Sequence, residues 1–126
     1  MKWKPYRYTT IVEAQARVET VKGTKIPDGF FLEITQMAII DITTGGKNLA
    51  IGFINLTGTF EVFCENEGTN IHHHEGNGRK FVFAGEQPAG RITTATAGDD
   101  CHFSVNGKLH PVELEAVPDA EIQPEN

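Results

Sequence analysis

The chain has 126 residues, a formal net charge of −6 at pH 7, 39% hydrophobic residues and 9% aromatic residues. This length fits one domain, and the apolar content is sufficient for a folded core. The negative charge argues against nucleic acid as a partner, because phosphate neutralisation needs a basic face. No apolar run approaches the roughly 20 residues of a membrane-spanning helix, and the first residues lack the apolar centre of a signal peptide. We therefore expect a protein that is made in a cytoplasm and has no membrane partner.

The first eight residues combine three basic side chains with aromatic side chains and contain no acid. Aromatic and Arg side chains are typical anchors of protein interfaces. Because this segment precedes the first clearly alternating run, we predict that residues 1–8 form an N-terminal arm that contacts a partner; a solvated chain end is the alternative. The predicted contact residues are Lys2, Trp3, Lys4, Tyr6 and Arg7.

Alternation of apolar and polar residues predicts β-strands through residues 9–116. From residue 12 to residue 18 the even positions are Val or Ala, whereas the odd positions are Glu, Gln or Arg. This period of two indicates a strand. Further strands are predicted over residues 30–42, 49–55, 59–65, 80–84, 91–96, 101–105 and 108–114. Gly-rich turn segments separate them, and Asn106-Gly107 is the strongest hairpin signal.

About eight strands without a convincing helix predict an all-β fold, an antiparallel jelly-roll-like β-sandwich. The apolar phase of each alternating run is expected to face one shared core. The predicted core residues are Val12, Ala14, Ala16, Leu32, Ile34, Phe60, Val62, Phe81, Phe83, Phe103 and Val105.

The run His72-His73-His74-Glu75 is the main candidate for chemistry. On a strand, His72 and His74 point to the same side and could share a metal, with Glu75 nearby. Cupin-like metal sites begin with such a His-x-His pair, but they also need a Glu several residues later and a third His in a distant Gly-rich segment. Neither stands at the expected spacing. We therefore predict no tightly bound metal and no cofactor, and we interpret the run as a polar strand end or loop.

No arrangement of nucleophiles indicates an enzyme. Ser104 is the only serine, and no glycine pattern of a nucleophile elbow surrounds it. Cys101 and His102 are neighbours, so on a strand they face opposite ways and cannot pair. We interpret Cys64 and Cys101 as small buried hydrophobic residues.

The end of the chain is acidic. From Pro111 onward the sequence has five acids and no Lys or Arg. Residues 117–126 are predicted to form an extended acidic tail. A basic head and an acidic tail suit docking onto other protein surfaces, with solvated termini as the alternative.

Three segments together resemble a known family. They are the run Lys-Ile-Pro-Asp-Gly-Phe-Phe-Leu-Glu-Ile at residues 25–34, the Gly-marked turn at residues 84–90, and Phe-Ser-Val-Asn-Gly at residues 103–107. With them, residues 8–116 resemble small jelly-roll virion proteins of tailed bacteriophages, of the type that decorates or cements capsids. The resemblance implies a trimer and no catalytic residues. The His run is a departure from the family pattern.

The first hypothesis for function is therefore a non-enzymatic structural virion protein that binds the outer surface of a phage head as a homotrimer. Its partners would be further copies of itself and the major capsid protein or another virion protein. It would be synthesised in the host cytoplasm and located in the virion. Two alternatives stay open: a carbohydrate-binding host-attachment module or tail or fibre component, and a cupin-like metal-binding protein that uses His72 and His74.

Overall fold

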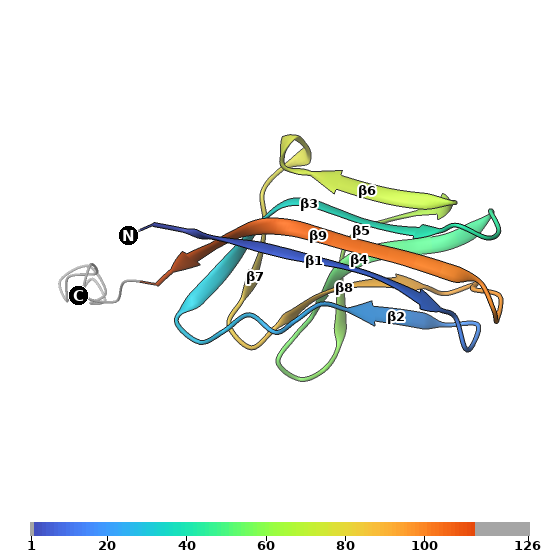
Figure 1. Ribbon diagram of the computed structural model, residues 1–126, viewed down its shortest axis with the longest axis horizontal. Helices are drawn as coiled ribbons and strands as arrows, with labels where there is room; N and C mark the ends of the chain where they lie inside the picture. The colour runs from blue at the N-terminus through green and yellow to red at the C-terminus, as the bar shows by residue number, and fades with distance from the viewer. Residues whose placement is uncertain (1, 113–126) are drawn as a thin grey trace, which may run out of the picture.

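The computed structural model describes residues 2–112 (Figure 1). Nine strands and one short 3-10 helix make up this part of the chain, and no helix in it is long and apolar enough to cross a bilayer. The elements are β1 (Lys4–Glu13), β2 (Glu19–Lys22), β3 (Phe30–Asp41), β4 (Lys47–Ile54), β5 (Phe60–Gly68), β6 (Asn70–His74), η1 (Glu75–Asn77), β7 (Lys80–Phe83), β8 (Gln87–Ile92) and β9 (Asp100–Pro111).

The strands form two antiparallel sheets that pack face to face (Figure 1). The larger sheet has the order β1-β9-β3-β6, with β7 also paired to β3, and the smaller sheet has the order β2-β8-β4-β5. The pairs are nested: β1 with β9, β2 with β8, β3 with β6 and β4 with β5. This is the jelly-roll arrangement. The predicted fold class is confirmed, and β7, which matches the strand predicted over residues 80–84, is a short strand beyond these eight.

The core lies between the two sheets and contains part of the predicted set. Five predicted core residues are buried, and Val12 packs partly against them. The buried five are Ala14, Leu32, Ile34, Phe103 and Val105. By contrast, Ala16 is exposed, Phe60 and Phe81 are only partly buried, and Val62 and Phe83 are about half exposed.

A β-bulge explains the error in β5. Ile51 of β4 pairs with Cys64, but the next residue, Gly52, pairs with Val62, so Phe63 is an extra residue in the ladder. An extra residue reverses the inward and outward phase of a strand. Phe63 and Cys64 therefore pack against the core, whereas Val62 faces outward.

In β7, inward and outward side chains alternate as predicted, but the residues predicted to face inward face outward. Val82 pairs with Leu32, and both are fully buried. Phe81 and Phe83 consequently point away from the core. Residues 81–83 are all apolar, so the sequence pattern could not show which phase faces inward.

The predicted hairpin at Asn106-Gly107 is wrong, because β9 continues straight through both residues. The two predicted strands on either side of them form one strand. A Cβ atom on residue 107 would overlap the backbone carbonyl of Glu33 on β3. This glycine therefore permits close approach of two strands rather than a turn.

The predicted N-terminal arm is largely part of the larger sheet. The predicted boundary between arm and domain lies inside β1, because this strand begins at Lys4 and pairs with β9 along its whole length. Residues 14–18, predicted as strand, connect β1 to β2. The predicted tail at residues 117–126 and the end of the strand predicted over 108–114 lie outside the described residues.

Candidate partner-binding surface

The outer face of the larger sheet carries an aromatic group of side chains, which we call the Phe31 cluster. Its members are Phe31, Phe81, Phe83 and His110. The Phe31 ring lies 5.1 Å from the His110 ring, 6.0 Å from Phe81 and 6.2 Å from Phe83, measured between centroids. Strand pairing places them together, since Phe31 pairs with His110 on one side and with Phe83 on the other. Phe83 is 55% exposed, so the cluster presents an aromatic edge to solvent.

Glu33 lies beside this cluster and contacts two basic side chains, those of His110 and Arg79. Its Oε1 atom lies 2.8 Å from Nε2 of His110, and its Oε2 atom lies 3.6 Å from Nε of Arg79. Although Glu33 is on the outer face, it is buried under its neighbours. This contact holds the His110 ring, which stacks on Phe31, in one orientation.

A hollow of about 410 Å³ lies where β1, β9 and the bulge of β3 meet. We call it the N-terminal hollow. Trp3 is 48% exposed, and the Lys108 ammonium lies 5.1 Å from the centre of its ring, a cation–π contact. None of the residues that line the hollow is acidic. They are Trp3, Pro5, Tyr6, Arg7, Thr35, Asn106, Gly107 and Lys108.

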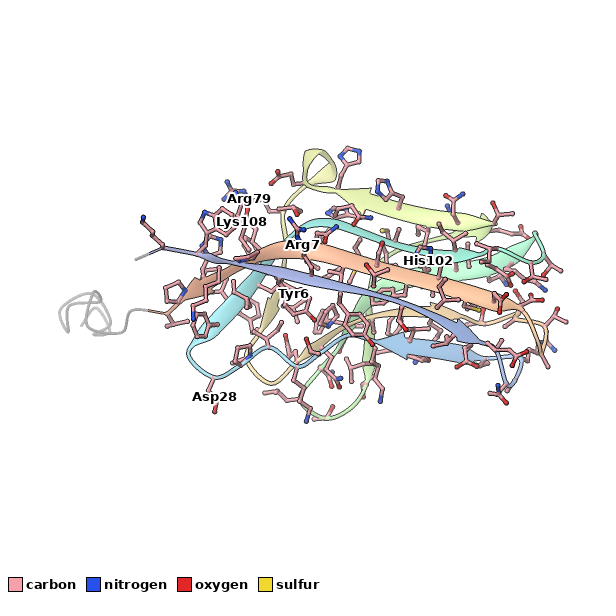
Figure 2. All side chains as sticks on the ribbon, viewed as in Figure 1. Tyr6, Arg7, Asp28, Arg79, His102 and Lys108 are labelled. Atoms are coloured by element: carbon pink, nitrogen blue, oxygen red, sulfur yellow. The ribbon has the colours of Figure 1, made fainter. Side chains whose placement is uncertain are left out.

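Pairing across β1 and β9 explains how this hollow forms. Pro5 pairs with Lys108 and Arg7 pairs with Asn106, so these side chains share the outer face. Figure 2 shows Arg7 and Lys108 on the outer side of the larger sheet, with Tyr6 on the opposite side of β1. The hollow therefore concentrates positive charge on a chain whose net charge is −6.

Two of the five predicted contact residues line the hollow with exposed side chains, namely Trp3 and Arg7. Lys2 is exposed and does not line it. Lys4 is also exposed, and its ammonium lies 5.3 Å from the Phe30 ring. The sequence interpretation missed Lys108 and Asn106, because only the pairing of β1 with β9 brings them to Arg7.

Tyr6 has a structural role instead of the predicted surface role. It is buried in the core, where its hydroxyl donates to the Thr24 carbonyl at 3.0 Å and accepts from the Thr24 Oγ1 hydroxyl at 3.0 Å. Burial raises the pKa of Tyr6 above its ordinary value. Tyr6 therefore joins β1 to the segment between β2 and β3.

The three histidines of the run end β6, and the outer two lie side by side as predicted. His72 pairs with Ala38 and His74 pairs with Gln36, and the two imidazole rings are 5.9 Å apart between centroids. Both side chains point away from the interior, so they cannot bind a metal ion between the two sheets. Within residues 2–112, no group of three or more His, Cys, Asp and Glu side chains is arranged to hold a metal.

His73 faces the opposite way and is almost fully buried. Burial lowers its pKa, and the charge of Lys80 lowers it further. No partner among the described residues reaches its Nε2 atom. The arrangement favours a neutral imidazole that packs in the core.

The two thiols are not activated. Burial raises the pKa of Cys101 to about 11, and burial also raises the pKa of Cys64. A raised pKa suppresses the thiolate, which is the reactive form. Cys101 faces the core whereas His102 on the same strand faces outward, as the sequence predicts.

Comparison of the chain with protein-family models and with curated proteins finds no match to either. The fold and the surface together define a jelly-roll domain whose larger sheet presents aromatic and basic side chains outward.

Proposed function

We propose that this chain is a non-enzymatic structural virion protein that binds the outer surface of a phage head as a homotrimer. The resemblance to phage decoration proteins supplies the virion context. The observation that carries the binding role is the N-terminal hollow, a basic and aromatic surface on an acidic protein. Jelly rolls occur both in viral capsid proteins and in lectins. The binding role is therefore inferred from the surface and not from the fold.

The chemistry of the hollow supports contact with an acidic segment of the major capsid protein or another virion protein. Trp and Arg are the residues that most often dominate binding energy at interfaces. Trp3 is already held by Lys108, so little side-chain freedom is lost when a partner covers it. The positive charges of Arg7 and Lys108 attract a negatively charged partner and orient it.

The open sheet edges support self-association. In the described part of the chain, β2 and β5 end the smaller sheet, and β1 and β6 end the main path of the larger one. Unpaired edges invite further strand pairing unless they are covered. A homotrimer that covers the β5 and β6 edges would leave β1, and with it the hollow, available to the capsid.

Co-sedimentation with purified capsids that lack this protein tests the proposal. Trp3→Ala and Arg7→Glu should each weaken binding by about tenfold or more, as loss of an interface anchor does. Arg17→Glu is the matched control, because Arg17 is exposed but lies in the connection after β1, away from the hollow. Binding should also weaken as salt is added.

Two outcomes would contradict the proposal. One is failure of the full chain to bind these capsids at about micromolar concentration, which is weak for a specific complex. The other is equal binding by the two hollow variants and the Arg17→Glu control, which would place the contact elsewhere.

A second candidate function is carbohydrate binding for host attachment, and the Phe31 cluster favours it. Sugar rings pack their apolar faces on aromatic side chains while neighbouring polar groups bond their hydroxyls. Phe83 supplies an exposed ring, and Arg79 and Glu33 supply polar groups close by. Binding to a glycan panel that Phe83→Ala abolishes, and Arg7→Glu preserves, would favour this function over decoration.

A further inference from the structure

The end of β3 and the start of β9 lie side by side at the end of the sandwich opposite the start of β1 and the end of β9 (Figure 1). A buried carboxyl group lies at each of these two places. Asp41 is the last residue of β3, and Asp99 directly precedes β9. Only 2% of Asp41 and 3% of Asp99 is exposed, and Thr44 hydrogen-bonds to both carboxyl groups and so brings them together. Two ionised carboxylates in contact and out of water would repel each other strongly.

The donors around this pair leave one oxygen unsatisfied. Asp41 Oδ1 accepts the backbone N–H groups of Thr43 and Thr44, both at 3.0 Å. Asp99 Oδ2 accepts the Thr44 hydroxyl at 2.6 Å. No N–H or O–H donor of the described residues reaches Asp41 Oδ2. Two carboxyl groups can hydrogen-bond only when one of them carries a proton.

We propose that Asp41 and Asp99 share one proton, held mainly on Asp41, and that the pair is a pH-sensitive clasp at this end of the sandwich. The clasp joins the turn after β3 to the segment before β9. Further bonds converge there: Asp41 N–H donates to the Thr69 carbonyl at 2.9 Å, and Asp100 N–H donates to Thr43 Oγ1 at 2.9 Å. Opening the pair would therefore loosen three contacts together: the one between the two carboxyl groups, the bond to Thr69 and the bond to Thr43.

The surrounding charges are mostly negative, which favours keeping the proton. Glu19 on β2 and Asp100 on β9 act with the pair to raise the pKa of the neighbouring Cys101 thiol. Lys47, at the start of β4, is the positive group that acts on Asp99, and its ammonium donates to Thr96 Oγ1 at 2.8 Å. A single partly engaged cation cannot neutralise two ionised carboxylates together with these acids.

The two pKa values move apart. Burial raises the pKa of Asp41, and the hydrogen bond with Asp99 raises it further. The same hydrogen bond, followed by that from Thr44, holds the pKa of Asp99 below its ordinary value. The Asp41 contribution to stability is present below its ordinary pKa and is lost as pH rises through its raised pKa. The Asp99 contribution is present above its ordinary pKa and is lost as pH falls through its lowered pKa.

The clasp is therefore closed in mildly acidic solution and loosens as pH rises. Thermal unfolding of the full chain from about pH 4 to about pH 9 tests this. Asp41→Asn keeps an oxygen for Thr43 and Thr44 and adds an N–H donor for Asp99, so it imitates the protonated state at every pH. The Tm of the wild type should fall by about 4 °C or more relative to Asp41→Asn as pH rises.

Asp28→Asn is the matched control, because Asp28 is exposed before β3 at the opposite end of the sandwich (Figure 2), and the same substitution there removes one charge far from the pair. Its pH profile should run parallel to that of the wild type. Parallel profiles for the wild type and Asp41→Asn would overturn the proposal.

Carboxyl carbon NMR gives a second test that needs only wild-type protein. Asp41 should titrate above the ordinary Asp pKa of about 3.9, and Asp99 below it. Ordinary titration of both groups would overturn the proposal. So would stabilisation of the wild type by calcium chloride over the whole pH range, because a cation rather than a proton would then join the carboxylates.

Discussion

The two faces of the larger sheet carry different kinds of side chain on the same strands. On β3, Leu32 points inward and is fully buried, while its neighbour Phe31 points outward into an exposed cluster. On β9, Phe103 is fully buried, whereas Lys108 lines the N-terminal hollow. Four of the five histidines lie on the outer face, and only His73 points inward. Core-facing and outward-facing side chains therefore alternate residue by residue, so single substitutions can test core stability and the proposed binding separately.

Truncation of one large side chain on each face gives the largest expected contrast. Leu32→Ala should lower the free energy of unfolding by about 2–5 kcal/mol, because it leaves a cavity between the sheets. Phe83→Ala should lower it by less than about 1 kcal/mol, since the ring is half exposed. Urea denaturation measures both values. Similar losses from the two variants would mean that the outer aromatic cluster is part of the core.

The inward phase could be predicted from sequence where the opposite face is polar. This holds for Leu32 and Ile34, whose flanking residues include Glu33 and Thr35. The prediction failed in β7, where residues 81–83 are all apolar, and in β5, where a bulge reverses the phase at Phe63. A bulge depends on the partner strand, so local alternation does not reveal it.

Two strands gave little or no sequence signal. β2 has only four residues, too few for alternation to stand out, and was not predicted. β6 consists largely of the His run, which has no apolar phase of its own beyond Ile71. Both are positioned by long-range pairing, with β8 and β3 respectively.

The candidate surface was predictable only in part. Trp3 and Arg7 stood out by composition because basic and aromatic residues are concentrated at the start of the chain. Asn106 and Lys108 carry no such signal, and the pairing of β1 with β9 joins segments from opposite parts of the sequence. Tyr6 and Tyr8 both point toward the core, and the mixed basic and aromatic residues around them do not reveal this phase.

The hydroxyl of Tyr6 gives a smaller expected effect on the inner side of β1. Tyr6→Phe keeps the ring in the core but removes both hydrogen bonds to Thr24. The free energy of unfolding should fall by about 1 kcal/mol, the usual contribution of such bonds. Tyr8→Phe is the matched control and should change it by less than about 0.5 kcal/mol. Urea denaturation of the three proteins checks this, and equal stability of all three would show that the Thr24 bonds contribute nothing net.

The smallest effect is expected at the outer His pair. His72 and His74 share a face, but the residues opposite them on β3, Ala38 and Gln36, supply no third His, Cys or carboxylate ligand. Zinc sites in proteins need three or four ligands, so a pair alone should not retain the ion. Dialysed, tag-free protein should therefore contain less than about 0.1 equivalent of zinc, iron or manganese by elemental analysis.

A His72→Ala/His74→Ala double variant provides the comparison for that measurement. Its Tm with added zinc should match its Tm without zinc, and the wild type should behave in the same way, because a ligand stabilises a protein only when it binds the folded state. Stoichiometric metal that survives dialysis of the wild type and is lost in the double variant would reverse this prediction. The outer face would then hold a metal site, and its contacts with a partner would have to be reinterpreted around that ion.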